Sequence, residues 1–298
     1  MKKIKKSLIE RLESEILICD GAMGTMLSNL GLPVGVSPEK WGIDNEDKLR
    51  SIHEGYIQAG ADIILTDTFG GNRFKLAKFG LENEVESINL AAAKLAVSSA
   101  GDDVYVAGDI GPSGEFMEPL GLVTESEMRD VFVQQATALV DGGVDFIIIE
   151  TMMDLNEIKT AIKAAKKTGL TVIASMSFNT DKNGFRTMMG VSPADAASGM
   201  LEAGADVIGA NCGNVEIKHM PELISEMKEA GAKYIIVEPN AGIPQIVDEK
   251  TVFAQTPEDM SAGVSEVIKA GANIIGGCCG TTPEHIKAIA EKVIEATK

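Results

Sequence analysis

Two adjacent cysteines, Cys278 and Cys279, lie in the stretch ANIIGGCCGTTPEH, directly after an apolar run and directly before a helix start. Neighbouring α-carbons are about 3.8 Å apart, whereas the α-carbons of ordinary disulfides lie roughly 4.4–6.8 Å apart. A bridge within the pair would therefore need a strained ring. Metal binding or catalysis explains the pair better, because both use the thiolate itself.

The other two cysteines also follow apolar runs. Cys212 ends the stretch ADVIGANC, and Cys19 lies in EILICD. Three thiolates with an open fourth position describe a catalytic zinc site, whereas structural zinc sites are closed by four ligands. Cys212, Cys278 and Cys279 are the candidate ligands. Cys19 directly precedes Asp20, and alternation along a strand turns these two side chains to opposite faces, so we expect Cys19 to be an ordinary buried thiol.

Eight apolar runs must position these residues. Four of them read alike, and each follows a helical pattern and a glycine: AGADIILTDT, GGVDFIIIET, AGADVIGANC and AGANIIGGCC. Four more runs alternate with them: EILICDGAMG, DVYVAGDIGP, LTVIASMSFN and KYIIVEPNAG. Near-continuous apolar runs are typical of parallel strands buried on both faces. Eight strands alternating with helices over roughly 250 residues predict an α/β protein with a (β/α)8 TIM barrel. A doubly wound open sheet is the alternative.

Helix-capping residues support this count. Three prolines follow a residue suited to the N-cap, and two further pairs are spaced as capping boxes. These positions are Ser192, Thr256 and Thr282 for the prolines, and Thr124 with Glu127 and Asp154 with Glu157 for the boxes. The N-terminus, MKKIKKSLIERLESE, has apolar residues at helical spacing but lacks the apolar run of a signal peptide. It predicts a short N-terminal helix.

Composition limits the class of protein. The chain of 298 residues is 45% hydrophobic and shows no linker or low-complexity tract, so we interpret residues 1–298 as a single barrel domain. The net charge of −17 argues against a nucleic-acid partner, because phosphate backbones are bound by Lys/Arg clusters. No run of 18 apolar residues predicts a membrane span. Four cysteines without an export signal fit a reducing cytoplasm.

In a barrel, the chemistry lies at the C-terminal ends of the strands. The residues predicted there form a polar rim: Asp20-Gly21, Thr66-Asp67-Thr68, Asp109, Glu150-Thr151, Ser177, Asn211-Cys212, Glu238-Pro239-Asn240 and Cys278-Cys279. Three of the four cysteines fall on this rim. Backbone N–H groups of the last segment, GG…GTTP, would alternatively form a phosphate site at a helix N-terminus, but that interpretation leaves the paired cysteines unexplained. The three histidines, His53, His219 and His285, are interpreted as surface residues or as residues behind the site.

Six stretches together resemble the homocysteine S-methyltransferase family, most closely the homocysteine-binding barrel of cobalamin-dependent methionine synthase. They are DGAMGTML, TDTFGGNRFKL, GDIGPSGE, GANCG, VEPNAG and GGCCGTTPEH, and the resemblance covers nearly the whole chain. It implies a (β/α)8 barrel whose Zn²⁺ is held by Cys212, Cys278 and Cys279. It also implies that Asn240 can act as a fourth ligand when substrate is absent.

The resemblance further implies an amino-acid pocket beside the metal. Asp20 and Glu150 would bind the amino group of homocysteine, while the backbone of Gly21 and Ala22, with Thr66, would hold its carboxylate. Asn211, which precedes Cys212, is counted with these substrate contacts.

The expected reaction is methyl transfer to the homocysteine sulfur. A free thiol has a pKa of about 8.5, and zinc coordination deprotonates it, which makes a nucleophile at pH 7. The product, methionine, is a neutral thioether and a poor zinc ligand. The folate-binding, cobalamin-binding and reactivation modules of full methionine synthase are not expected in this chain, so the methyl group would come from a separate corrinoid protein or from a small donor. The resemblance to the cobalamin-dependent barrel favours a methylated corrinoid protein, with methylcobalamin as its cofactor. S-methylmethionine or S-adenosylmethionine is the alternative donor. Outside catalysis, the alternative is a zinc-binding subunit of a larger methyltransferase complex.

Overall fold

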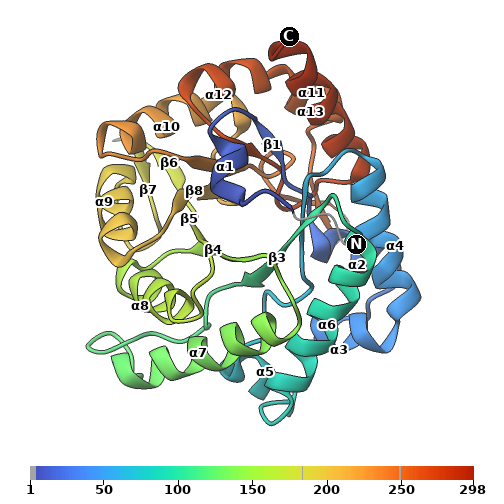
Figure 1. Ribbon diagram of the computed structural model, residues 1–298. Coiled ribbons are helices and arrows are strands. Elements are labelled where there is room, and N and C mark those ends of the chain that lie inside the picture. Colours follow the sequence, from blue (N-terminus) through green and yellow to red (C-terminus); the bar gives the residue numbers. More distant parts are fainter. Residues whose placement is uncertain (1–4, 183, 248–249) are drawn as a thin grey trace.

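Eight parallel strands form one sheet that curls into a barrel surrounded by helices (Figure 1). The computed structural model describes residues 5–182, 184–247 and 250–298. The barrel strands are β1 (Leu17–Ile18), β2 (Ile63–Leu65), β3 (Tyr105–Ile110), β4 (Phe146–Met152), β5 (Val172–Met176), β8 (Val207–Asn211), β9 (Ile235–Glu238) and β12 (Ile274–Ile275). Their order is β1-β12-β9-β8-β5-β4-β3-β2, and a bridge between Cys19 and Ile63 brings the two end strands together. The predicted (β/α)8 barrel is confirmed.

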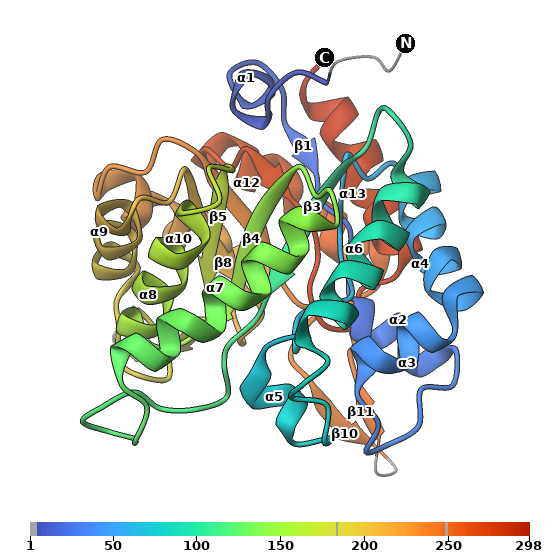
Figure 2. The ribbon, with the colours of Figure 1, turned by 60° about the horizontal axis from the view of Figure 1, so that its bottom comes forward.

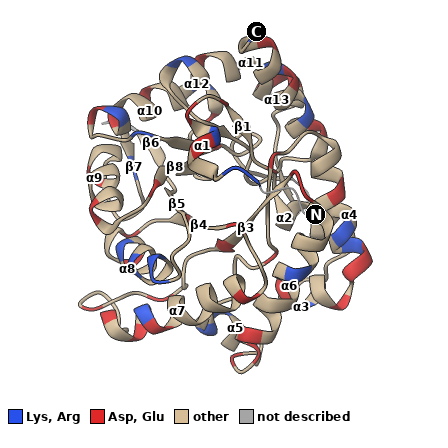
Figure 3. Cartoon of the chain, viewed as in Figure 1, with Lys and Arg blue, Asp and Glu red and all other residues tan. Residues whose placement is uncertain are grey.

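Helices separate the strands and bury one face against them. They are α2 (Met23–Asn29), α3 (Pro38–Asp44), α4 (Glu46–Gln58), α5 (Arg73–Ala77), α6 (Val85–Ala100), α7 (Glu125–Asp141), α8 (Leu155–Lys166), α9 (Pro193–Ala203), η1 (Ile217–His219), α10 (Met220–Glu229), α11 (Pro257–Ala262), α12 (Val264–Ala270) and α13 (Pro283–Ala296). Acidic and basic residues lie mostly on this outer ring (Figure 3). Within the described residues, no helix is both long and apolar enough to span a membrane.

The N-terminal end of the barrel is closed by a short helix. Helix α1 (Leu8–Leu12) inserts Leu8 and Leu12 into the cluster of buried side chains that fills the barrel. The Tyr105 hydroxyl donates to the backbone oxygen of Lys6 at 2.6 Å and ties the segment to β3. Figure 2 shows α1 at the end of the molecule opposite to β10 and β11. The predicted N-terminal helix is confirmed for Leu8–Leu12, while its first four residues lie outside the described ranges.

Two short hairpins were not predicted. Strands β6 (Asn179–Asp181) and β7 (Gly184–Arg186) follow β5, and β10 (Gln245–Val247) and β11 (Lys250–Val252) follow β9. Each strand has three residues, which is too short to show a strand period. Both hairpins extend loops at the C-terminal end of the barrel, the end left open for chemistry.

Most predicted helix caps are confirmed. Ser192, Thr256, Thr282 and Thr124 are the N-caps of α9, α11, α13 and α7. The predicted capping box of Asp154 with Glu157 is wrong in one half. Asp154 accepts from the backbone N–H of Glu157 at 3.0 Å, but the Glu157 carboxylate does not return to Asp154. It accepts instead from the backbone N–H of Ser113 at 2.8 Å, because the loop after β3 supplies a buried donor.

Candidate metal centre and substrate pocket

Three sulfur atoms meet at the open end of the barrel. Cys212 directly follows β8, Cys278 and Cys279 follow β12, and their Sγ atoms all lie within 4.8 Å of one another. The Sγ atoms of Cys278 and Cys279 are 4.0 Å apart, so both thiols are free. Cys19 is excluded from the cluster and packs inside the barrel, as predicted. None of the three histidines joins the cluster of described residues, and His53 is fully buried in α4 rather than on the surface.

The backbone at Cys212 adopts a rare conformation. Cys212 has φ 56° and Gly213 follows with φ 66°, so two successive residues are left-handed. For a residue other than glycine this costs about 1–3 kcal/mol and persists only where the surroundings hold it. The Cys212 N–H donates to the Glu238 oxygen of the neighbouring strand at 3.1 Å. A Cβ at position 213 would overlap the Phe178 oxygen, so only glycine fits there.

The segment that carries the paired cysteines is held on both sides. The Cys278 N–H donates to the Pro239 oxygen at 2.9 Å, and the Ala241 N–H donates to the Cys279 oxygen at 2.9 Å. The Thr281 hydroxyl donates to the Cys278 oxygen at 2.7 Å. The two cysteines therefore have a fixed backbone that is shared with the loop after β9. Such pre-organisation is what a metal site needs from its supporting residues.

The three thiols share their protons unequally. Hydrogen bonds from Cys278 and then Cys279 lower the pKa of Cys212 to about 3. The same contact with Cys212 raises the pKa of Cys278 well above its usual value and that of Cys279 to about 12. The cluster therefore gathers negative charge at one point, which a divalent cation would neutralise. Three soft sulfur donors from two strand ends fit Zn²⁺, which prefers cysteine thiolates.

Asn240 lies beside this cluster. Its Nδ2 donates to the Gly213 oxygen at 2.8 Å, and its side chain is a further cause of the lowered pKa of Cys212. Its Oδ1 is buried and has no hydrogen-bond partner among the described residues. A free amide oxygen next to three thiols suits a fourth ligand, the role predicted for Asn240, which stays a prediction.

Asn211 connects the sulfur cluster to the acidic side of the pocket. Its Nδ2 donates to Glu150 Oε2 at 2.6 Å and to the Thr151 hydroxyl at 2.6 Å. Its Oδ1 accepts from the Thr151 N–H at 2.8 Å and from the Ser175 hydroxyl at 2.5 Å. Thr151 is left-handed, with φ 60°, and its two bonds to Asn211, through its N–H and its hydroxyl, hold it in this conformation.

Both carboxyl groups predicted to bind the substrate are buried and have raised pKa values. Burial, followed by the negative charge of Cys212, raises the pKa of Glu150 to about 7. Burial also raises the pKa of Asp20, whose Oδ2 accepts from the Leu65 N–H at 2.9 Å. The charge of Glu150 adds to the rise at Asp20, so the two groups belong to one electrostatic system. A positively charged ammonium group beside both carboxyls would lower their pKa values and stabilise their charged forms.

The predicted carboxylate site is partly occupied by the protein itself. The Ala22 N–H donates to the Thr281 hydroxyl at 3.0 Å, and Thr66 Oγ1 is paired with Thr68 Oγ1 at 2.6 Å. A Cβ at Gly21 would lie 2.7 Å from Thr281 Oγ1, so this segment needs glycine for a close approach. A substrate carboxylate that uses the Ala22 N–H must share or displace the bond to Thr281.

Two residues of this site were missed in the sequence. Thr281 bonds both Ala22 and Cys278, and the Tyr56 hydroxyl of α4 donates to the Ala22 oxygen at 3.2 Å. Thr281 lies within GTTPEH, where only the neighbouring Thr282 gave a helix-cap signal. Tyr56 lies in an amphipathic helix, where a buried aromatic residue reads as core. No local signal distinguishes these roles.

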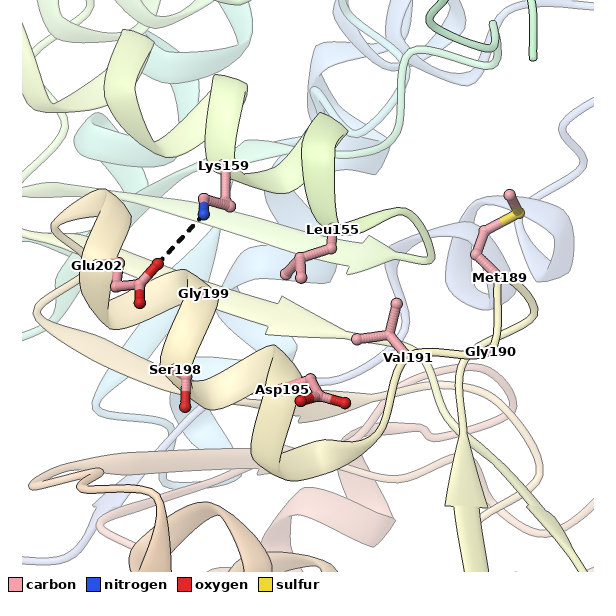
Figure 4. Close-up of a pocket in the computed structure, with 9 residues that line it drawn as sticks. All are labelled: Leu155, Lys159, Met189, Gly190, Val191, Asp195, Ser198, Gly199 and Glu202. Carbon is pink, nitrogen blue, oxygen red and sulfur yellow. Dashed lines mark hydrogen bonds and ion pairs between the residues drawn. The ribbon is translucent and has the colours of Figure 1, made fainter. Parts of the chain in front are cut away.

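A separate hollow of about 380 Å³ lies in the outer layer, between α8 and α9 (Figure 4). Leu155 and Gly199 are among the residues that line it, and an ion pair of 3.3 Å joins Lys159 to Glu202 at its edge. None of the rim residues predicted to do chemistry lines it. The hollow is therefore distinct from the thiol cluster.

Comparison with known proteins agrees with this geometry. The sequence model described as homocysteine S-methyltransferase matches residues 17–293. The methionine synthases of Mycobacterium leprae (strain TN) and Mycobacterium tuberculosis (strain ATCC 25618 / H37Rv) are 29% and 30% identical over 96% of the chain. The chain spans 25% of the length of each of these curated relatives. The metallated form of the homocysteine methyltransferase MmuM from Escherichia coli matches with a TM-score of 0.78 and 21% identity, over 96% of this chain and 99% of that one.

Proposed function

The chain belongs to the homocysteine S-methyltransferase family, and on that premise we propose that it methylates the thiol of homocysteine, giving methionine, at a zinc site formed by Cys212, Cys278 and Cys279. One observation carries the proposal: three sulfur atoms lie within 4.8 Å of one another, and Asn211 bonds directly to the acidic group beside them. Sulfur donors suit zinc, and the acidic groups suit the ammonium group of an amino acid.

The pocket residues would hold the two ends of the substrate. Asp20 and Glu150 receive the ammonium group, and Gly21, Ala22 and Thr66 receive the carboxylate. A Zn²⁺ held by the three thiolates would supply the positive charge that keeps the substrate sulfur deprotonated at neutral pH. Asn240 is proposed as the ligand that gives way when substrate enters.

The proposed methyl transfer is a nucleophilic substitution at the methyl carbon. The homocysteine sulfur gives an electron pair to the methyl carbon, and the bond from that carbon to the donor breaks with its electrons leaving on the donor. The thiol proton is released to solvent. The protein contributes by orienting the sulfur towards the open end and by holding both ends of the amino acid while the donor approaches.

We propose a methylated corrinoid protein, carrying methylcobalamin, as the donor. Loops at the open end expose large apolar side chains, among them Val34 at 104%, Leu122 at 94% and Ile246 at 83% of full exposure. Apolar side chains on three loops around the open end would give a partner protein surface to contact, which a small donor does not need. The similarity to methionine synthases supports the same choice. We also propose that residues 1–298 act as one barrel domain in the cytoplasm, which suits four free thiols.

The test is methionine formation by the anaerobic, zinc-loaded protein given L-homocysteine, with methylcobalamin and S-methylmethionine in separate vessels. We expect methionine from methylcobalamin. Methionine from S-methylmethionine alone would replace the corrinoid donor with the sulfonium compound. Tight zinc binding without measurable homocysteine binding would contradict the enzyme and favour the non-catalytic subunit.

A further inference from the structure

Asp109 lies at the C-terminal end of β3, on the inner face of the barrel. Tyr105 and Ala107, four and two residues earlier, belong to the cluster of side chains that fills the barrel, whereas Val106 and Ile110 belong to the outer core beneath the helices. Because side chains alternate along a strand, Asp109 continues the inward series. It therefore projects into the barrel directly below the open end.

The backbone holds Asp109 firmly in this position. Its N–H donates to Thr66 Oγ1 at 2.9 Å, and its carbonyl oxygen accepts from the Thr68 hydroxyl at 2.7 Å. The residue is 4% exposed, and its Oδ1 is buried without a hydrogen-bond partner among the described residues. A buried polar atom without a partner is costly, so a native structure that keeps one calls for an explanation.

The surroundings of Asp109 are acidic. After burial, the charges of Glu150, Glu238 and Asp20 raise the pKa of Asp109, in that order. Asp109 in turn hydrogen-bonds Glu150, which lowers the pKa of Glu150. Asp109 is thus part of the same group of carboxyls as the two residues proposed to bind the ammonium group.

Among the described residues, no Lys or Arg makes an ion pair with this group of carboxyls. Lys75 acts on both Asp109 and Glu150 from a distance. Its Nζ lies 4.4 Å from the centre of the Phe69 ring and makes no ion pair with any residue in the described part of the chain. A cationic ligand would therefore supply the positive charge that the described part of the chain does not place beside these carboxyls.

We propose that Asp109 is a third acidic residue of the amino-acid pocket, and that its free oxygen accepts a hydrogen bond from the substrate ammonium group beside Glu150. The inference rests on the proposed function and deepens it. Asp109 then selects thiols that carry an ammonium group over thiols that lack one. A hydrogen bond between charged groups is worth about tenfold to 100-fold in binding.

The test measures binding of L-homocysteine and of 4-mercaptobutanoic acid, which has the same carbon chain and thiol but no ammonium group. Calorimetry on zinc-loaded protein compares wild type with Asp109→Asn, which keeps the shape and removes the ionisable carboxyl group. We expect Asp109→Asn to weaken homocysteine binding by about tenfold or more and to change 4-mercaptobutanoic acid binding by less than about threefold. Zinc content is measured for each sample, so loss of metal is separated from loss of the contact.

Asp67→Asn is the matched control. Asp67 is also 4% exposed with a free buried oxygen at a neighbouring strand end, but that oxygen lies against Gly42 of α3. The charge of Asp67 makes only the smallest of the contributions that raise the pKa of Asp109, so Asp67→Asn should weaken homocysteine binding by less than about threefold. If the Asp109→Asn protein does not fold, the smaller substitution Asp109→Ser serves as the second variant.

The outcomes separate the two proposals. Zinc-loaded wild type that fails to bind homocysteine overturns the proposed function itself. Wild type that binds homocysteine while a folded Asp109 variant binds it equally well overturns the role of Asp109. Equal weakening of both thiols also overturns it, because the ammonium group would then not be the group that Asp109 recognises.

Discussion

Asn211 joins Glu150 to Cys278. Its Nδ2 lies 2.6 Å from Glu150 Oε2 and 3.8 Å from Cys278 Sγ, so one amide contacts both the acidic side and the sulfur side of the pocket. The short carbon chain of the substrate limits how far its ammonium group can lie from its sulfur. A side chain that spans the two sites therefore sets whether one amino acid reaches both.

Asn211→Ala should destabilise the protein and weaken homocysteine binding. The substitution leaves the Thr151 N–H and the Ser175 hydroxyl without their buried acceptor. Each buried unsatisfied group costs about 1–3 kcal/mol, so we expect a loss of about 2–4 kcal/mol in urea denaturation. Asn214→Ala is the control, because Asn214 also accepts a backbone N–H, from Thr180, but at an exposed site. Equal losses in both variants would contradict the special position of Asn211.

Cys279→Ala should lose most of its zinc after dialysis. Two thiolates and the neutral amide of Asn240 remain in the variant, whereas the wild type offers three thiolates, the donors that Zn²⁺ prefers. Cys19→Ala removes a fully buried thiol from the barrel interior, outside the thiol cluster, and should keep the wild-type zinc content. Metal is measured by elemental analysis of folded protein. Full retention of zinc by Cys279→Ala would remove this residue from the ligand set.

Gly213→Ala should cost more than an alanine at another left-handed glycine. At Gly213 a Cβ meets the Phe178 backbone, whereas at Gly190, with φ 84°, a Cβ meets nothing within 4 Å. Gly190→Ala pays only for its backbone conformation, about 1 kcal/mol, and Gly213→Ala adds a displacement of the chain worth about 2 kcal/mol or more. Because Cys212 is the preceding residue, zinc affinity should fall in Gly213→Ala alone. Thermal and urea unfolding of the zinc-free proteins, with zinc titration of each, check both parts.

The strand ends were predictable because an apolar run in the local sequence marks each strand. Apolar runs place Cys212 and Cys278 at the ends of strands, and the barrel topology then brings them together. The left-handed backbone at Cys212 was not predictable, since its N–H bonds the backbone oxygen of Glu238 on the next strand, which the local sequence does not reveal.

The contacts of Thr281 could not be predicted for the same reason. Its hydroxyl meets Ala22 across 259 positions of the chain, and no periodic pattern records so distant a pairing. The Glu157 carboxylate likewise left its predicted capping box for Ser113, 44 positions away. Tertiary partners override local rules where a buried donor needs an acceptor.

His53 should make the protein less stable as the pH falls from 6.5 to 4. It is fully buried in α4, both ring nitrogens lack partners in the described structure, and burial, with a smaller effect of Arg50, lowers its pKa from 6.5 to about 4. Between these values the unfolded chain binds the proton and the folded chain does not, so the free energy of unfolding rises with pH through this window. Protonation of His53 lowers the free energy of unfolding by about 3 kcal/mol in all once the pH is below 4. About 2 kcal/mol of this decrease occurs between pH 7 and pH 5.

The measurement is urea denaturation of wild type and His53→Leu at pH 7 and pH 5. Buried carboxyls such as Asp67, whose pKa burial raises, act with the opposite sign, because the folded chain takes up their proton first as the pH falls. They are common to both proteins, so the difference between the two pH profiles isolates His53. Wild type should lose about 2 kcal/mol more than His53→Leu over this interval. Parallel profiles would contradict the prediction, because they would show that the pKa of His53 is the same in the folded and the unfolded chain.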